Sequence, residues 1–126
     1  MAIWEFGLET TPFEAVVAGR KTIEGRLNTG KFAQFAAGDI VKVRRDYRDK
    51  NGVIQDGEPD AARVEVVAVR KYANFSDLVN AEGVERVGSV LASAEETIDG
   101  YAEYYSVEEQ AKYGVLAIEV SVIGSE

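Results

Sequence analysis

The chain has 126 residues, of which 46% are hydrophobic and 29% charged, and it contains only two prolines. This composition excludes a disordered or low-complexity chain and is sufficient for one domain with a buried core. There is no cysteine and no histidine, so disulfides, thiolate nucleophiles and imidazole chemistry are excluded, and a metal ion would need oxygen ligands alone. The net charge of −8 argues against a general electrostatic attraction to polyanions.

Hydropathy also limits the organisation and location that we expect. No apolar run approaches the roughly 18 residues that a membrane-spanning helix needs. The first residues lack the basic and apolar segments of a secretory signal. We therefore expect a single domain over residues 1–126, located in the cytoplasm, with no membrane partner, no cofactor and no bound metal. The oligomeric state stays open.

The first half of the chain predicts strands and one short helix. Apolar and other residues alternate over 4–8, which is typical of a half-buried strand. Residues 11–14, Thr-Pro-Phe-Glu, predict a capping box with proline at the first helical position, and Gly19 is suited to end that helix. Three further segments follow, two extended and one rich in turn residues: 22–27, 40–44 and 46–60. We interpret the turn-rich segment as an exposed hairpin or a long loop.

The second half predicts a strand, three short helices and a closing strand. The segment 63–69 is rich in β-branched residues and strand-like. Asn74, Ser93 and Ser106 are each followed by an acidic residue three positions later, which indicates the start of a helix. Strict alternation predicts a strand over 113–123.

Strands outnumber helices in this prediction, and the helices are short. We therefore expect an α+β protein, with a small mixed sheet of about five or six strands curled into a barrel and short helices over its openings. No glycine-rich phosphate loop follows a strand, so nucleotide binding of the Rossmann or Walker kind has no support.

Basic residues are concentrated in one part of the chain. Residues 20–50 hold nine lysines and arginines against four acidic residues, whereas the rest of the chain is acidic. An acidic protein with this distribution can present one basic face, formed here by Lys42, Arg44, Arg45 and Arg48. An ordinary solvated surface with an uneven order of charges explains the pattern equally well.

The segment 19–26 is the strongest candidate for a functional site, because it places a cation, a carboxylate and a second cation close together. On an extended backbone Thr22, Glu24 and Arg26 share one face, and Lys21 lies at a turn from which it can reach the same side. A carboxylate accepts a hydrogen bond from an amino group or ring N–H, whereas the cations contact phosphate or carbonyl oxygens. The alternative is a surface ion pair worth a fraction of a kcal/mol.

The pattern G-x-K-x-x-E-x-R, formed by Gly19, Lys21, Glu24 and Arg26, resembles the signature of the ASCH domain family, a branch of the PUA-like superfamily. The resemblance spans roughly residues 6–121. It continues in the same order through three further segments: 38–39, 75–83 and 104–118. It implies a PUA-like β-barrel with a cleft lined by the G-x-K-x-x-E-x-R segment, and a role in recognising RNA or a nucleoside.

We therefore expect a single-domain ASCH protein that binds single-stranded RNA or a modified nucleoside or nucleotide in this cleft. The expected ligand-binding residues are Gly19, Lys21, Thr22, Glu24, Arg26, Arg44, Arg45, Glu85 and Tyr105. The resemblance also implies a later glutamate, which corresponds to Glu82 or Glu85 unless both are solvated loop charges. Tyr72, Tyr104 and Tyr105 are possible base-stacking residues, although aromatic residues near helices usually belong to the core.

An enzyme is the main alternative, with Lys21 and Glu24 as its catalytic residues. The resemblance implies either an amidohydrolase acting on N4-acetylcytidine or a metal-independent ribonuclease in which Lys21 stabilises the transition state and Glu24 is the general base. The amidohydrolase branch carries a threonine where this chain has Glu24. Thr22 lies two positions away, about 7 Å along a strand, which disfavours that chemistry. A protein-interaction domain with a basic hairpin is a third possibility.

Overall fold

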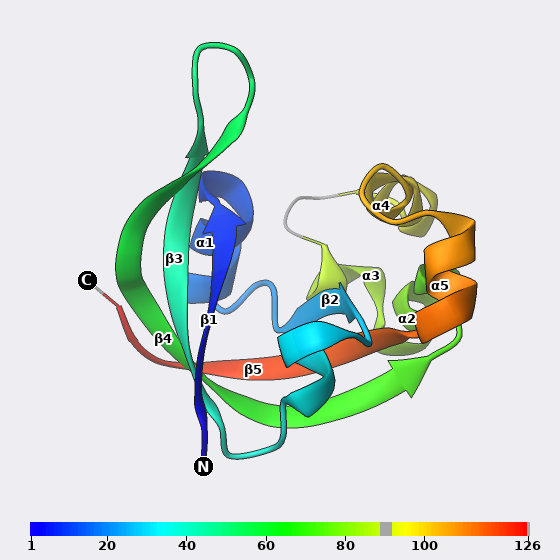
Figure 1. Ribbon diagram of the computed structural model, residues 1–126, viewed down its shortest axis with the longest axis horizontal. Coiled ribbons are helices and arrows are strands. Elements are labelled where there is room, and N and C mark those ends of the chain that lie inside the picture. The colour runs from blue at the N-terminus through cyan, green and yellow to red at the C-terminus, as the bar shows by residue number, and fades with distance from the viewer. Residues whose placement is uncertain (89–91, 126) are drawn as a thin grey trace.

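The computed structural model describes residues 1–88 and 92–125 and has one five-stranded sheet with the strand order β1-β3-β4-β5-β2 (Figure 1). β1 is parallel to β3, and the other neighbouring strands are antiparallel. The strands are β1 (Ile3–Glu9), β2 (Ile23–Leu27), β3 (Ile40–Arg48), β4 (Ile54–Tyr72) and β5 (Val115–Ser125). The predicted α+β class and the predicted number of strands are confirmed.

The sheet is a curled half-barrel rather than a closed barrel, with β1 and β2 as its edges. The 19-residue β4 pairs with β3 along one part and with β5 along the other. Register shifts between Arg63 and Val64, and between Val66 and Ala68, interrupt its ladder with β5. Irregularities of this kind bend a strand and increase its twist, so they help β4 to curl around the core.

Short helices fill the space between and beside the strands. They are α1 (Thr10–Val17), the 3₁₀ helix η1 (Gly30–Gln34), α2 (Phe75–Glu82), α3 (Val84–Val87), α4 (Ala94–Ala102) and α5 (Val107–Tyr113). Asn74, Ser93 and Ser106 cap α2, α4 and α5, and the two serines form complete capping boxes, as predicted. None of the helices in the described ranges is long and apolar enough to cross a membrane.

The predicted capping box at the start of α1 is wrong. β1 extends to Glu9 and the helix begins at the next residue, so Thr11 is already helical and no side chain caps the helix. The end of α1 agrees with the prediction, because Gly19 follows the helix with φ of 79°. The short η1 and α3 were not predicted, since elements of four or five residues are too short to show a periodic pattern.

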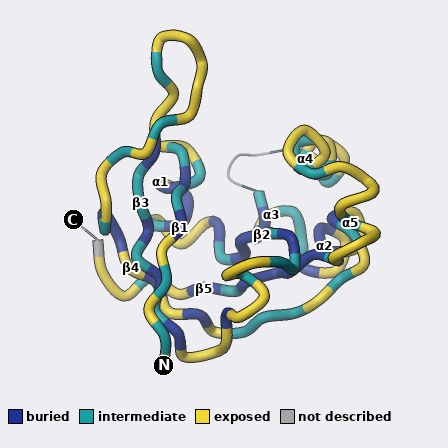
Figure 2. Tube along the Cα trace, in the orientation of Figure 1, coloured by how far each residue is buried: buried dark blue, intermediate teal, exposed yellow. Residues whose placement is uncertain are grey.

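Two hydrophobic clusters hold the fold together. Figure 2 shows the buried residues along the strands of the sheet and the helices that pack against it. The larger one lies within the curl of the sheet and includes Phe6, Phe13 and Val43. The second joins β2 and β5 to the helices and includes Ile23 and Phe75. β5 contributes to both clusters, so its residues 115–118 are buried on both faces even though their alternation predicts a half-buried strand.

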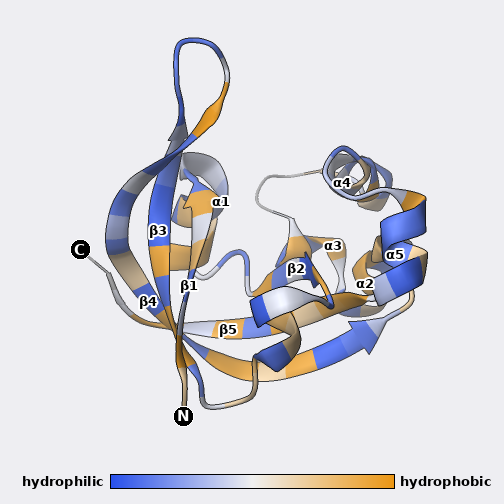
Figure 3. Cartoon of the chain, in the orientation of Figure 1, coloured by the Kyte–Doolittle hydropathy of each residue, from blue (hydrophilic) through white to orange (hydrophobic). Residues whose placement is uncertain are grey.

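The turn-rich segment 46–60 is a hairpin, one of the two predicted forms, and both of its strands continue the sheet (Figure 1). β3 and β4 extend beyond the sheet as an arm and are joined by residues 49–53. The Asp49 carboxylate accepts hydrogen bonds from the amides of Asn51 and Val53. Figure 3 shows that the arm is largely hydrophilic, with one hydrophobic stretch on one of its sides. Val53 and Ile54, at the end of the connecting turn and the start of β4, are both exposed.

The buried Asp39 attaches β1 to the rest of the sheet and generates a prediction about acid stability. The amide of Ala2, the indole of Trp4 and the amide of Ala36 donate hydrogen bonds to its carboxylate, at 2.9, 2.9 and 3.0 Å. These bonds lower the pKa of Asp39 below its ordinary value. The stabilisation that the Asp39 carboxylate gives to the folded state is therefore fully present when the pH is above the ordinary pKa of an aspartate. It is lost as the pH falls through the lower pKa of Asp39 in the folded state.

We expect Asp39→Asn to reduce the free energy of unfolding by about 1–2 kcal/mol at neutral pH, and we expect this difference to shrink as the pH falls below about 4. Urea denaturation at several pH values, followed by the fluorescence of the single tryptophan, measures it. The exposed Asp99→Asn is the control and should show little difference throughout. An equal loss for Asp39→Asn at pH 3 and pH 7 would contradict the assignment.

Candidate ligand-binding cleft

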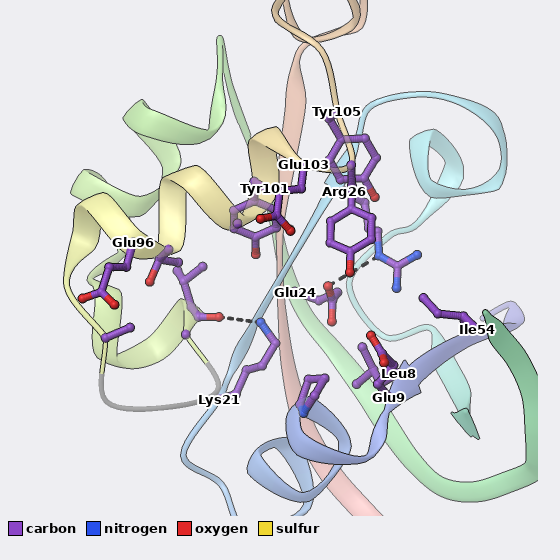
Figure 4. Close-up of a pocket in the computed structure, with 18 residues that line it drawn as sticks. Leu8, Glu9, Lys21, Glu24, Arg26, Ile54, Glu96, Tyr101, Glu103 and Tyr105 are labelled. Carbon is purple, nitrogen blue, oxygen red and sulfur yellow. Dashed lines mark hydrogen bonds and ion pairs between the residues drawn. The ribbon is translucent and has the colours of Figure 1, made fainter. Parts of the chain in front are cut away.

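A cleft of about 560 Å³ lies between β2, the end of β1, the start of the hairpin's second strand, and α4 (Figure 4). β2 contributes Glu24, Gly25 and Arg26 to it. Lys21, which precedes β2, also lines the cleft. One side is completed by Leu8, Glu9, Pro12 and Ile54. The other side is formed by Val87, Gly88, Ala92, Glu96, Thr97, Gly100, Tyr101, Glu103, Tyr104 and Tyr105. This volume is typical of small-molecule binding sites.

Lys21 is a buried lysine whose position depends on the turn after α1. The amides of Arg20 and Lys21 both donate to the carbonyl of Ala15, so the chain folds back against the helix. The Lys21 ammonium then donates to the carbonyls of Ile23 and Val87, at 2.7 and 2.5 Å. Burial lowers the pKa of Lys21, and the nearby Glu24 carboxylate partly opposes this shift.

Glu24 is the second buried ionisable residue of the cleft, with a relative exposure of 6%. Its Oε1 accepts a long hydrogen bond from Nε of Arg26, at 3.4 Å. Its Oε2 is buried and has no hydrogen-bond partner within the described residues. Buried polar atoms in proteins are nearly always paired, so this oxygen is an unusual free acceptor on a residue that lines the cleft.

Arg26 connects the two edges of the half-barrel. Its Nη2 donates to the carbonyl of Gly7 in β1, at 3.2 Å, while its Nε contacts Glu24. The guanidinium also lies over the rings of Phe6 and Phe32, at 5.2 and 4.8 Å from their centroids. These contacts fix the guanidinium from three sides, so Arg26 positions the Glu24 carboxylate in addition to lining the cleft.

Aromatic rings form the side of the cleft next to α4. Tyr101 stacks on Phe75 with centroids 4.1 Å apart and planes at 4°. A Cβ at Gly25 would lie 2.7 Å from the Tyr101 hydroxyl, so glycine is needed there for the ring to approach β2. Tyr105 also stacks on Phe75, at 5.3 Å. Burial raises the pKa of both tyrosines above the ordinary value.

One exposed arginine of the hairpin arm joins both sides of the cleft. Arg48 contacts the carboxylate of Glu9, with Nε to Oε1 at 2.7 Å, and it donates to the hydroxyl of Tyr104 at 3.1 Å. Its Nη1 donates to the carbonyl of Gly52 in the turn of the arm. Arg48 therefore links the arm, the end of β1 and the segment after α4.

The structure brings four of the nine predicted ligand-binding residues to this cleft: Lys21, Glu24, Arg26 and Tyr105. The spacing of the first three predicts this convergence, and the geometry agrees. That they bind a ligand stays a prediction. The other five predicted residues do not line it: Gly19, Thr22, Arg44, Arg45 and Glu85.

Three of these five residues, Gly19, Thr22 and Glu85, have other positions in the fold. Gly19 makes the turn that places Lys21. Thr22 precedes the regular part of β2, and its hydroxyl accepts a 3.4 Å hydrogen bond from Arg86, so it does not share the cleft with Glu24. Glu85 is an exposed residue of α3.

The predicted basic face is largely neutralised by acidic neighbours. Arg44 contacts Glu5, Asp46 and Asp56. Arg45 pairs with Glu14, as Arg48 does with Glu9. The alternative in the sequence interpretation, an ordinary solvated surface, therefore describes these three arginines better than a basic binding face does.

Glu82, the other possible family glutamate, belongs to a separate ionic cluster. Arg70 donates to both of its oxygens, at 2.6 and 2.7 Å, and the hydroxyl of Tyr72 donates at 2.5 Å. The guanidinium of Arg70 is the main cause of the lowered pKa of Glu82. Arg70 and Arg86 also contact Glu119. Tyr72 is thus engaged outside the cleft, and this cluster joins β4, β5, α2 and α3.

Sequence reasoning missed several residues of the cleft. Tyr101 was not predicted as a ligand-binding residue; it lines the cleft and also packs against the second hydrophobic cluster. Glu96 was recognised only as the last residue of a capping box, and Glu103 had no signal at all. Within the described residues no group of three acidic side chains is arranged to hold a metal ion.

A curled five-stranded half-barrel with short helices is an α+β fold consistent with the PUA-like class. The family model of the ASCH domain matches residues 6–124, and this chain belongs to the ASCH domain family. A search of curated proteins finds no match.

Solved structures agree with this assignment. The crystal structure of hypothetical protein PH0355 is 35% identical, with a TM-score of 0.79 over 96% of this chain and 99% of that one. The solution NMR structure of protein PF0455 from Pyrococcus furiosus is 33% identical, with a TM-score of 0.73 over 96% and 97%. Protein EF3133 from Enterococcus faecalis V583, at 16% identity and a TM-score of 0.63 over 99% and 77%, shares the fold.

The double role of Arg26 generates a stability prediction. Arg26→Ala removes the bond to Gly7 and leaves the buried Glu24 without its cation, so we expect a loss of about 2 kcal/mol in the free energy of unfolding. The double variant Arg26→Ala/Glu24→Gln should regain part of this loss, because it removes the uncompensated charge. Chemical denaturation of the three proteins measures the coupling.

Arg45→Ala provides the control for Arg26, because the pair of Arg45 with Glu14 is exposed. It should cost less than about 0.5 kcal/mol. Equal effects of Arg26→Ala and Arg45→Ala, or no recovery in the double variant, would contradict the role given to Arg26.

Proposed function

We propose that this protein binds the base of a nucleoside or of single-stranded RNA in the cleft. The observation that carries the proposal is the buried and unpartnered Oε2 of Glu24. An unsatisfied buried oxygen costs about 1–3 kcal/mol, which a ligand N–H would recover. Amino groups and ring N–H groups of nucleobases are donors of this kind, and carboxylates accept hydrogen bonds from them.

Lys21 complements Glu24 with a donor. A lysine ammonium has three protons, and two of those on Lys21 are engaged by the carbonyls of Ile23 and Val87. The third is available to a carbonyl or ring nitrogen. A neighbouring donor and acceptor match the polar edge of a nucleobase, in which these groups alternate.

The rest of the cleft supports a flat aromatic ligand. Tyr101 and Tyr105 line one side, and base–aromatic stacking is worth about 1–3 kcal/mol per base. Leu8 and Ile54 contribute apolar surface on the other side. Membership of the ASCH family also supports a ligand related to nucleic acids.

Calorimetric titration with the four ribonucleosides and short single-stranded RNAs tests the proposal. We expect at least one of these ligands to bind the wild type, and Glu24→Gln to weaken it by about tenfold or more, equivalent to about 1.4 kcal/mol. Glu85→Gln is the matched control, because Glu85 is exposed and does not line the cleft, and it should bind normally. Thermal melting confirms that each variant is folded.

Two results would contradict the binding proposal. One is the absence of binding to any nucleoside or RNA. The other is an equal loss of affinity in Glu24→Gln and Glu85→Gln, which would mean that the cleft is not the site.

An enzyme is a second candidate, and the lowered pKa of Lys21 supports it, because a buried amine beside a carboxylate can take part in proton transfer. The Thr22 hydroxyl does not line the cleft, which disfavours a threonine nucleophile there. We expect deacetylation of N4-acetylcytidine to be slow or absent, and Glu24→Thr not to lower the rate. Chromatography of the reaction products measures this, and efficient turnover that Glu24→Thr abolishes would establish Glu24 as essential to the reaction.

A further inference from the structure

The charges around the cleft are mainly negative. Its described lining contains four glutamates, namely Glu9, Glu24, Glu96 and Glu103, but only two cations, Lys21 and Arg26. Both cations already contact protein acceptors: Lys21 the carbonyls of Ile23 and Val87, and Arg26 the carbonyl of Gly7 and the Glu24 carboxylate. The cleft therefore has little positive charge to offer to an anion.

Two of the acidic side chains are not neutralised. Glu9 is paired with Arg48, whereas Glu96 and Glu103 form no ion pair within the described residues and are exposed. Oε1 of Glu96 accepts hydrogen bonds from Ser93 and completes the cap of α4, which leaves its charge in place. Figure 4 shows Glu96 and Glu103 on the α4 side of the cleft and Glu9 on the opposite side.

The arginines of β3 offer little free positive charge to a phosphate. Arg44, Arg45 and Arg48 are paired with acidic residues, so a phosphodiester backbone would have to displace those partners. Affinity for RNA depends strongly on phosphate contacts with free lysine and arginine side chains. Against this background, the buried free acceptor on Glu24 favours a ligand that brings donors rather than negative charge.

We infer that the ligand of the cleft is a free nucleoside without phosphate, and that Glu96 and Glu103 are specificity-determining residues that repel phosphorylated forms. This inference rests on the proposed function and narrows its ligand class. Glu24 and Lys21 contact the base, whereas the carboxylates of Glu96 in α4 and of Glu103 directly after it repel a phosphate attached to the sugar. The resulting selectivity is electrostatic and decreases as salt concentration increases.

The test compares the best-binding nucleoside with its 3′- and 5′-monophosphates and with a trinucleotide that has the same central base. At an ionic strength of about 0.1 M we expect the nucleoside to bind about fivefold more tightly than either monophosphate. In Glu96→Gln/Glu103→Gln this ratio should fall below about twofold, because the monophosphates bind more tightly than they do to the wild type. Glutamine at position 96 can still accept the hydrogen bonds from Ser93.

Glu95→Gln/Asp99→Asn is the matched control, because it removes the same charge from exposed positions on α4 that do not line the cleft. It should leave the ratio at about fivefold. Tighter binding of a monophosphate or of the trinucleotide than of the nucleoside would overturn the inference while supporting the proposed function. A ratio unchanged in Glu96→Gln/Glu103→Gln would also overturn it, and failure of every nucleoside and RNA to bind would instead refute the proposed function.

Discussion

The guanidinium of Arg26 spans the open side of the half-barrel, where two strand edges face each other without a ladder between them. It donates to the carbonyl of Gly7 in β1, contacts the carboxylate of Glu24 in its own strand, and lies over Phe6 and Phe32. An unpaired strand edge normally exposes backbone groups to other chains. Here a side chain satisfies one of these groups and brings β2 close to β1, and the cleft depends on that approach.

The same arrangement explains how two ionisable residues can be buried side by side. Lys21 is held by two backbone carbonyls, and Glu24 is held by Arg26 on only one of its oxygens. Burial of a charge is costly unless partners compensate it, so a carboxylate with a free buried oxygen has a lower energy once a donor arrives. We propose that a hydrogen-bond donor of the ligand pairs with this oxygen.

Charge is distributed differently in space than along the chain. The arginines of β3 that give residues 20–50 their basic character contact acidic residues from β1, α1 and the hairpin arm, so little of their charge is free. Meanwhile α4 brings Glu96 and Glu103 to the cleft, which makes the lining acidic. A cleft with an acidic lining is poorly suited to a strand of phosphates, which supports the proposal of an uncharged nucleoside as its ligand.

The sequence by itself determined the features that depend on near neighbours: the helix caps at Asn74, Ser93 and Ser106, the turn at Gly19, and the G-x-K-x-x-E-x-R pattern that indicates the ASCH family. Only the tertiary structure decided which distant elements meet. It separated Thr22 and Glu85 from Glu24, engaged Glu82 with Arg70, and added residues of α4 to the cleft. A side chain's partners across the fold are set by how strands and helices pack, and a pattern of a few consecutive residues does not encode that packing.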